Sequence, residues 1–347
     1  MHILITGNMG YIGPTLTRYF RSNHSSVKIT GFDTGFFGHC LSGVDQLPET
    51  RIDLQIYGDL RHFPESALDG VDVVVHLAAI SNDPMGKSYE EVTHDINYSA
   101  SIDLAKKAKA RGVKKFIFAS SCSIYGFAEG GPRTEQDELN PLTAYALSKV
   151  AMEKGLNELA DSAFNVTCLR FATACGMSDR IRLDLVLNDF VAGAVSTGNI
   201  DILSDGTPWR PLITTLDMSR AISWASTREA DNGGQFLAVN TGTETWNYQV
   251  KELATAVADV IPDTTVSINE NAMPDKRSYR VDFSLFKKLA PEHQPQQTLT
   301  QAVREIYEGL SKMKFNDTNF RDSDLMRLNV LTKLQASNRI NKELFWQ

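Results

Sequence analysis

Three glycines near the start of the chain are spaced for binding a phosphate group. They lie in Thr6-Gly-Asn-Met-Gly-Tyr-Ile-Gly13, between a predicted strand and a predicted helix. Glycine lets the backbone turn tightly and approach a pyrophosphate, and the free N–H groups at the helix start face the anion. Pro14 fits an early helical position, where an N–H has no intrahelical partner. The residues expected to bind a dinucleotide here are Gly7, Gly10, Tyr11, Ile12 and Gly13.

An acidic residue lies at the spacing expected for the ribose end of such a dinucleotide. Asp33 follows Gly13 by 20 positions and ends the second predicted strand. Its carboxylate can accept hydrogen bonds from the adenosine ribose, whereas a 2′-phosphate would meet a like charge. No Arg or Lys lies in the glycine loop or directly after Asp33 to offset that repulsion. The expected cofactor is therefore NAD rather than NADP.

Two further segments follow predicted strands and could contact the same ligand. Asp59-Leu60 follows the third strand, and Leu77-Ala78-Ala79 follows the fourth, where small side chains would let a cofactor lie close to the backbone. Open α/β sheets bind ligands at the carboxyl ends of their strands. We therefore expect both segments to line the cofactor site.

A tyrosine and a lysine form a candidate catalytic pair. Tyr145 and Lys149 lie one turn apart on a predicted helix and so share one of its faces. The strand before this helix ends in Ser120-Ser121-Cys122-Ser123, which places hydroxyl groups at the carboxyl edge of the sheet. The hydroxyls and the two titratable side chains are therefore expected at one site.

The elements that must position these residues alternate along the first half of the chain. Strands are predicted at 2–6, 27–32, 52–57, 72–77, 115–120 and 165–171, and helices at 11–23, 88–111 and 143–162. Repeated strand–helix–strand units form right-handed crossovers and a parallel sheet covered on both faces. The predicted fold class is α/β, a Rossmann-type doubly wound parallel sheet with a smaller α/β substrate-binding lobe.

The second half of the chain has weaker periodicity and shorter elements. A strand is predicted near 211–215, and helices near 184–196, 217–228, 247–260 and 299–313. We assign residues 1–176 to the cofactor domain, with segments around 209–246 returning to it, and 177–315 mainly to the lobe. Residues 316–347 are predicted to be a helical extension, because leucines recur at helical spacing within 322–345.

Composition and charge exclude several classes of protein. The 347 residues are 42% hydrophobic and 22% charged, with a formal net charge of −7. This excludes a disordered chain and argues against non-specific binding to nucleic acid or to an anionic membrane. The four cysteines lack metal-ligand spacing, and no export signal or membrane-spanning run is evident. We therefore expect a cytoplasmic protein with reduced thiols and no metal site.

Together these motifs resemble the extended short-chain dehydrogenase/reductase superfamily, in its nucleotide-sugar epimerase and dehydratase branch, which includes the UDP-glucose 4-epimerases. The resemblance runs from residue 1 to about 315. It rests on Thr6-Gly-x-x-Gly-x-x-Gly13, Asp33, Leu77-Ala-Ala79, Asn97, Ser120-Ser121 before Tyr125-Gly126, and Asn140-Pro141 before Tyr145-x-x-x-Lys149. It implies NAD as cofactor, a nucleotide-sugar substrate, and a homodimer formed through helices 88–111 and 143–162.

The resemblance also implies a role for each catalytic residue. Tyr145, as a phenolate, would take a proton from a sugar hydroxyl while a hydride passes to the nicotinamide, so its pKa must fall from about 10 toward neutrality. Lys149 and the positive nicotinamide would favour the phenolate, and Lys149 would hold the nicotinamide ribose. Ser121 would align the reacting hydroxyl, and Asn97 would contribute to the cofactor site.

The two positions after Ser121 distinguish reactions within this branch. In its 4,6-dehydratases they are an Asp and a Glu that eliminate water, whereas here they are Cys122 and Ser123. The leading hypothesis is an NAD-dependent epimerase that oxidises a sugar transiently and returns the hydride. The alternatives are a nucleotide-sugar 4-ketoreductase or dehydrogenase and, more remotely, a non-catalytic NAD-binding sensor.

Substrate contacts are also expected by resemblance. Arg210 and Arg277 are expected at the substrate's diphosphate, which suits bidentate guanidinium contacts, and Asn188 is expected to bind the same group. Many relatives carry Asn where this chain has Thr173, which leaves the sugar and the inverted carbon open. The sequence also leaves open whether Arg180 and Arg182 bind phosphate or lie on the surface. The expected substrate-binding residues are Ser121, Ser123, Thr173, Asn188, Arg210 and Arg277.

Overall fold

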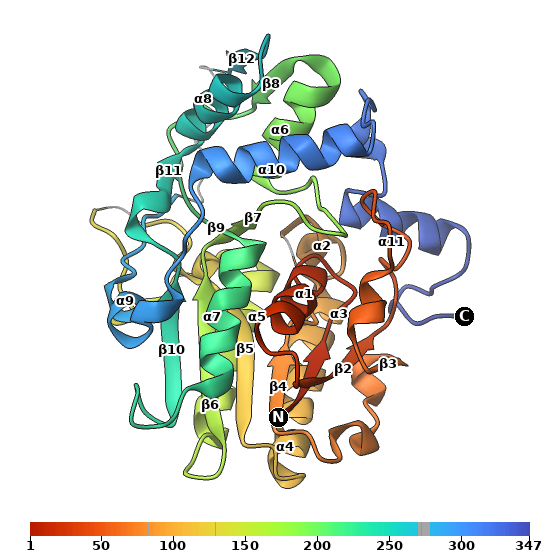
Figure 1. Cartoon of the computed structure of the whole chain (residues 1–347), viewed down its shortest axis with the longest axis vertical. Helices are drawn as coiled ribbons and strands as arrows, with labels where there is room; N and C mark the ends of the chain where they lie inside the picture. Colours follow the sequence, from red (N-terminus) through yellow and green to blue (C-terminus); the bar gives the residue numbers. More distant parts are fainter. Residues whose placement is uncertain (82, 129, 270–271, 273–277) are drawn as a thin grey trace.

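A seven-stranded parallel sheet forms the centre of the computed structural model, which describes residues 1–81, 83–128, 130–269, 272 and 278–347 (Figure 1). Its strand order is β10-β6-β5-β4-β1-β2-β3, and every neighbouring pair is parallel. The strands are β1 (His2–Thr6), β2 (Lys28–Asp33), β3 (Leu54–Tyr57), β4 (Val73–His76), β5 (Lys115–Ser121), β6 (Asn165–Phe171) and β10 (Phe236–Thr241). The predicted Rossmann-type α/β fold is confirmed.

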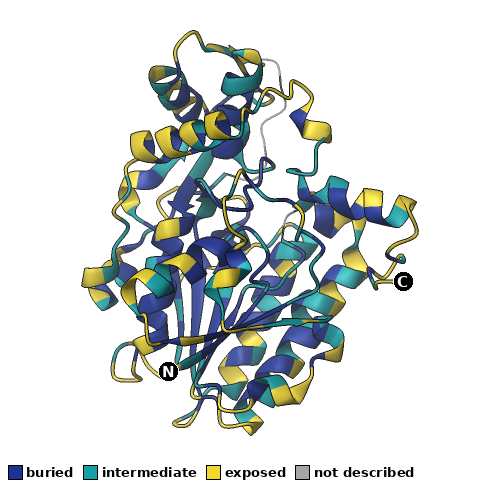
Figure 2. Cartoon of the chain, turned by 45° about the vertical axis from the view of Figure 1, so that its right-hand side comes forward, coloured by how far each residue is buried: buried dark blue, intermediate teal, exposed yellow. Residues whose placement is uncertain are grey.

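Both faces of this sheet are covered by helices, which explains the continuous apolar runs of its strands. Alternate residues of a strand point to opposite faces, so Ile3 packs under α1 (Gly13–Asn23) and α7 (Thr215–Thr227), whereas Leu4 packs under α4 (Ser101–Ala110) and α5 (Ala144–Leu159). Figure 2 shows the sheet strands dark blue and each covering helix buried on one side. Two apolar cores therefore sandwich the sheet.

The predicted helix at 88–111 is interrupted. The structure has α2 (Asp83–Ser88), α3 (Glu90–His94), a π-helical turn over Asp95–Ala100 and then α4. Within the π turn, the Asn97 side chain bonds both backbone groups of Ile80, and the Ser101 hydroxyl donates to the Ile96 carbonyl. Side-chain bonds to the backbone compete with helical pairing, which accounts for the break.

A smaller lobe lies over the carboxyl edge of the sheet (Figure 1). It contains α6 (Val186–Thr197), α8 (Val250–Val260) and α10 (Leu299–Lys312), which contact one another, and the parallel pair β8 (Asn199–Ile202) and β12 (Thr265–Ile268). A three-stranded sheet of β7 (Thr173–Cys175), β9 (Trp209–Thr214) and β11 (Asn247–Gln249) joins the lobe to the larger sheet. The remaining elements are α9 (Ser284–Leu289) and the 3-10 turns Pro48–Arg51, Leu60–His62, Glu65–Leu68, Cys122–Tyr125, Glu244–Trp246, Pro291–His293 and Phe320–Asp322.

The chain crosses between domain and lobe more than once. After β9, helix α7 and strand β10 rejoin the large sheet, within the segment 209–246 that the sequence assigns to the cofactor domain. The predicted helical extension at 316–347 is helical only in α11 (Arg327–Ala336) and in the 3-10 turn Phe320–Asp322. Asn338 and Leu344 have φ of 55° and 60°, a left-handed backbone that does not continue a helix. No helix in the described ranges is long and apolar enough to cross a membrane.

Candidate active site

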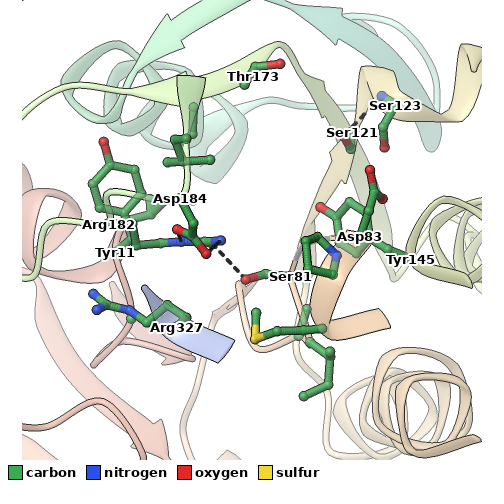
Figure 3. A pocket seen from close by; sticks show the side chains of 18 of the residues that line it. Tyr11, Ser81, Asp83, Ser121, Ser123, Tyr145, Thr173, Arg182, Asp184 and Arg327 are labelled. Atoms are coloured by element: carbon green, nitrogen blue, oxygen red, sulfur yellow. Dashed lines mark hydrogen bonds and ion pairs between the residues drawn. The ribbon is translucent and has the colours of Figure 1, made fainter. Parts of the chain in front are cut away.

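A cavity of about 830 Å³ opens between the carboxyl edge of the sheet and the lobe. Figure 3 shows its interior, where Tyr11, Ser81, Tyr145 and Arg182 approach one another from different elements. Sixteen of the residues predicted for the site line this cavity: Gly7, Gly10, Tyr11, Ile12, Asp33, Asp59, Leu60, Leu77, Ala78, Ala79, Ser121, Ser123, Tyr145, Lys149, Thr173 and Arg210.

The glycine loop leaves space for an anion at the start of α1. Gly7 has φ of 74°, and a Cβ there would lie 2.6 Å from the Ala78 backbone nitrogen. A Cβ on Gly13 would lie 2.0 Å from the Asn8 carbonyl oxygen, so this glycine is required by packing and does not line the cavity. At Gly10 a Cβ would meet only the Gly7 oxygen, at 3.2 Å. Because α1 has no side-chain cap, its first N–H groups remain available, and the loop fits a pyrophosphate.

Asp33 is held at the cavity wall by backbone donors. The Met9 N–H donates to its Oδ2 at 3.0 Å and the Gly35 N–H to its Oδ1 at 2.8 Å. Burial raises the pKa of this carboxyl, and the two hydrogen bonds oppose that rise. Arg180 is buried nearby but pairs with Glu49 at 2.7 Å. The carboxylate therefore fits ribose hydroxyls better than a 2′-phosphate.

Asp59 is also engaged by a neighbouring cation. The Arg61 guanidinium donates to its two carboxylate oxygens at 2.9 and 2.7 Å, and the Arg61 backbone N–H donates at 2.8 Å. The pair lies where β3 ends, and Leu60 adds an apolar side chain to the same part of the cavity.

Ser121 and Tyr145 meet at the opposite end of the cavity (Figure 3). Ser121 ends β5 and Tyr145 lies in the first turn of α5, which Thr143 caps by accepting from the Ala146 N–H. Burial raises the pKa of Tyr145 to about 12, while a hydrogen bond with Ser121 and the charge of Arg182 oppose this rise. Without a ligand, Tyr145 is therefore a neutral phenol at physiological pH.

Lys149 is buried beside Tyr145, but it contacts the backbone rather than the phenol oxygen. Its Nζ donates to the Ala119 carbonyl at 2.7 Å and lies 5.3 Å from the centre of the Tyr145 ring. Burial lowers the pKa of Lys149 to about 7, although the Glu153 charge opposes this. The expected lowering of the Tyr145 pKa is not seen in this structure: Ser121 and Arg182 only oppose the rise caused by burial, and Lys149 is not among the opposing groups.

A buried ion pair holds α5, the helix that carries Tyr145 and Lys149, against strand β6. Arg170 on β6 donates to both oxygens of Glu153 on α5, the shortest contact being 2.8 Å, and the Ser120 hydroxyl donates to Glu153 at 2.5 Å. Arg170 also donates to the Tyr125 hydroxyl at 3.0 Å. The sequence analysis did not identify this network; the available signal was Glu153, one turn after Lys149 on the same helix.

Two predicted ligand residues lie behind the cavity wall. Asn97 holds the backbone of Ile80 and donates to Ser148 at 3.2 Å. Asn188 accepts from the Gly176 N–H at 3.0 Å and donates to the Tyr11 hydroxyl at 3.0 Å. Neither lines the cavity, so both fix the positions of residues that do.

The substrate end of the cavity is polar. The Ser123 hydroxyl oxygen is buried and has no partner among the described residues, which is the condition expected of a group awaiting a ligand. Thr173 begins β7 at the cavity, and Arg210 donates to the Trp209 carbonyl at 2.9 Å. Arg277 lies outside the described residues.

The structure shows that Arg182 is a further cation in the cavity wall. Arg182 is bound by Asp184 at 2.8 and 3.0 Å and donates to the Ser81 hydroxyl at 2.9 Å, between Tyr11 and Tyr145 (Figure 3). The sequence left open whether Arg182 binds phosphate or lies on the surface. Its burial here makes it part of the site, whereas Arg180 belongs to the interior.

The cysteines are buried, and none contributes a reactive thiolate. Burial raises the pKa of Cys122 and Cys175, and Cys122 donates to the Arg170 carbonyl at 3.0 Å. Within the described part of the chain, no group of three or more His, Cys, Asp or Glu side chains could hold a metal ion.

The fold is a Rossmann-type sheet, and the cavity at its carboxyl edge brings the glycine loop and Asp33 together with Ser121, Tyr145 and Lys149. The family model described as "NAD dependent epimerase/dehydratase family" matches residues 3–242, and the chain belongs to this family. It is thus an enzyme of the extended short-chain dehydrogenase/reductase superfamily. The dependence of the family on NAD agrees with the cofactor predicted from Asp33.

Similar proteins cover nearly the whole chain. The UDP-glucose 4-epimerase of Mycolicibacterium smegmatis is 27% identical over 322 residues, covering 89% of this chain and 98% of that protein. The UDP-glucose 4-epimerase of Bacillus subtilis is 28% identical and covers 75% of this chain and 82% of its own length.

Solved structures share the fold. A UDP-glucuronic acid 4-epimerase from Bacillus cereus, in complex with UDP-glucuronic acid and NAD, has a TM-score of 0.76, 22% identity and coverage of 90% of this chain and all of that chain. An NAD-dependent NDP-hexosamine 5,6-dehydratase involved in tunicamycin biosynthesis has a TM-score of 0.75, 23% identity and coverage of 92% and 99%.

Proposed function

We propose that this enzyme is an NAD-dependent nucleotide-sugar epimerase, which oxidises a ring carbon to a ketone and then returns the hydride. The observation that carries the proposal is the convergence of Ser121, Tyr145 and Lys149 on the cavity that the glycine loop and Asp33 also line. The positions after Ser121 support epimerisation over 4,6-dehydration, since Cys122 is buried against a carbonyl and Ser123 is not an acid or a base at neutral pH.

The chain's own residues account for the proton movements. NAD, when bound, supplies the acceptor that takes the hydride from the sugar carbon and gives it back. Tyr145 Oη takes the proton of the sugar hydroxyl as the carbonyl forms and returns it after the hydride has been added to the other face. Ser121 holds the reacting oxygen against Tyr145, and the charge of Arg182 favours the phenolate, while Lys149, 5.3 Å from the Tyr145 ring centre, is placed to hold the nicotinamide ribose.

The substrate class follows from the polar half of the cavity. Arg210 lines it together with Arg182, and guanidinium groups suit a diphosphate. Ser123 offers an unpartnered hydroxyl to a sugar oxygen. The M. smegmatis and B. subtilis relatives are named for UDP-glucose, which makes UDP-hexoses the first substrates to test.

The test is incubation of the enzyme with a panel of nucleotide sugars in deuterated water, followed by proton NMR. Inversion by hydride return leaves no solvent deuterium in the product. Tyr145→Phe should lower kcat by at least about 100-fold while NAD still binds, because only the proton acceptor is lost. Net consumption of NADH with substrate would instead identify a ketoreductase, and full activity of Tyr145→Phe would refute the proposed mechanism.

A cytoplasmic homodimer remains part of this proposal. The helices implied for the interface, α4 and α5, pack against each other, and Leu147 on α5 is 55% exposed. Analytical ultracentrifugation of the purified enzyme would measure its oligomeric state, and a monomer at micromolar concentration would contradict the homodimer.

A further inference from the structure

The last part of the chain crosses from the lobe to the cofactor domain. Residues 316–347, here called the C-terminal segment, begin at the lobe, where Phe320 is buried in its core and Arg321 pairs with Asp189 at 2.7 Å. Helix α11 then packs Leu331 and Leu334 against Phe36, Ile80 and Met85 of the cofactor domain. The segment therefore spans the mouth of the cavity rather than extending into solvent.

Four side chains of this segment form part of the cavity wall. They are Arg321, Met326, Arg327 and Leu331. Leu331 packs in one apolar cluster with Phe36, and Thr34 and Phe36, which follow Asp33 at the predicted adenosine end of NAD, line the same cavity. The cofactor site is thus incomplete without residues that lie beyond the family match at 3–242.

The end of the segment is tied to the loop after β2. The Trp346 indole N–H donates to the Thr34 carbonyl at 2.8 Å, and its ring lies 5.2 Å from the ring of Phe36. Asp33, immediately before Thr34, is the residue predicted to bind the ribose. A hydrogen bond and an aromatic contact therefore hold the loop that carries this carboxylate.

The same stretch also holds the partner of Asp59. The Arg61 guanidinium lies 3.5 Å from the centre of the Phe345 ring and donates to the Glu343 carbonyl at 2.7 Å. The other edge of the Arg61 guanidinium binds Asp59. Residues 343–346 therefore contact the segments that follow both β2 and β3.

Arg327 fixes the position of α11. Its side chain is 1% exposed and donates to the carbonyls of Arg180, Ile181 and Asp324 at 2.8, 3.1 and 3.2 Å. No carboxylate among the described residues forms an ion pair with it. A buried cation held by backbone carbonyls and by the face of the Phe37 ring, 5.1 Å away, loses these contacts when it moves, which favours one docked position of the segment.

From these contacts we propose that the C-terminal segment forms the outer wall of the cofactor site and that bound NAD leaves only when the segment undocks. The inference rests on the proposed NAD site. Retention of the cofactor suits an epimerase, because the hydride returns in every turnover and no cofactor exchange is needed.

The experiment measures NAD dissociation from the full-length enzyme. Protein loaded with radiolabelled NAD is chased with excess unlabelled NAD, and bound label is counted by filtration over time. The variants are Trp346→Ala and a chain ending at Ile340; Lys333→Ala is the matched control, because Lys333 lies on α11 but pairs with the exposed Asp324. Circular dichroism and thermal melting check that each variant is folded.

Release should be roughly tenfold faster or more in both test variants and unchanged in Lys333→Ala, given the loss of one hydrogen bond and one aromatic contact. Equal release rates in wild type and in folded Trp346→Ala and truncated protein would overturn this inference while leaving the NAD site intact. A folded wild-type enzyme that binds no NAD would overturn the proposed function as well.

Discussion

At the scale of single residues, burial shifts the pKa values of both members of the catalytic pair. Tyr145 is a phenol with a pKa of about 12, and Lys149 has a pKa of about 7, both because of burial. Arg182, bound to Asp184 and Ser81, is the fixed cation that opposes the rise at Tyr145. Positive charge brought close to Tyr145 would lower this pKa and favour the phenolate, which is the form that accepts a proton.

His76 is a buried neutral imidazole beneath this site. Ser101 already donates its hydroxyl proton to Ile96, so it accepts from the Nε2–H of His76 at 2.8 Å, and Nδ1 accepts from Thr6 at 2.7 Å. Burial, followed by the charge of Lys149, lowers the pKa of His76 to about 3.

This shifted pKa predicts a pH dependence of stability. Above pH 6.5 His76 is neutral in both states and contributes no slope. Below it the unfolded chain binds a proton that the folded protein excludes, so the free energy of unfolding falls by up to about 1.4 kcal/mol per pH unit toward pH 3. Urea unfolding of wild type and His76→Asn between pH 7.5 and 5 measures this slope. Identical slopes would show that His76 does not carry it.

At the residue level, the sequence placed residues at the cavity where a motif is local, and their roles there stay predictions. The glycine loop, Asp33, Ser121 and the Tyr145–Lys149 spacing lie within short segments whose geometry is fixed by one strand and one helix. Arg182 was not resolved by sequence, because its neighbour Ser81 is 101 positions away and only the lobe brings them together. Asn97 and Asn188 turned out to bind backbone and side chains of this chain.

At the scale of elements, α5 is locked to the sheet by Glu153 and Arg170. Their side chains are 6% and 8% exposed, so the pair is a buried one. Removing one partner would leave the other charge without compensation in the interior.

Glu153→Gln should therefore lower the free energy of unfolding by about 3 kcal/mol. Glu158→Gln, on the exposed side of the same helix, should change it by less than about 0.5 kcal/mol. Chemical denaturation of both variants measures the difference. Equal effects would show that the pair contributes no more than a surface charge.

Helices and strands were predictable from the sequence where a hydrophobic pattern extends over many residues. They were not predictable where pairing with a distant segment determines the local structure. Strands at 2–6 and 165–171 agree with β1 and β6, but β10 was missed. The three- and four-residue strands β7, β8, β11 and β12 carry too few residues for a pattern of their own. Leucine spacing predicted a helix through 322–345, yet α11 ends at Ala336 because the chain turns back to the cofactor domain.

At the scale of the whole molecule, Tyr11 couples the two domains. It belongs to the glycine loop, but its ring packs in the core of the lobe. Its hydroxyl donates to the Gly176 carbonyl and accepts from Asn188 at 3.0 Å. A displacement of the glycine loop would therefore also move Tyr11 and the lobe residues that it contacts.

Tyr11→Phe keeps the ring and leaves those two polar groups unsatisfied. The free energy of unfolding should fall by about 1–3 kcal/mol, whereas Tyr57→Phe, at a tyrosine that is 65% exposed, should leave it nearly unchanged. Urea titration followed by tryptophan fluorescence measures both variants. A Tyr11→Phe protein as stable as wild type would show that the hydroxyl does not couple the domains.

The contact between Trp346 and Thr34 has a consequence for how the enzyme is made. The two residues are 312 positions apart in the chain. Strands β1 to β3 can pair soon after they leave the ribosome, but the wall beside them is finished only after some 300 more residues have been translated. During synthesis there is thus a stage at which the strands have formed but the C-terminal segment does not yet cover the predicted cofactor site.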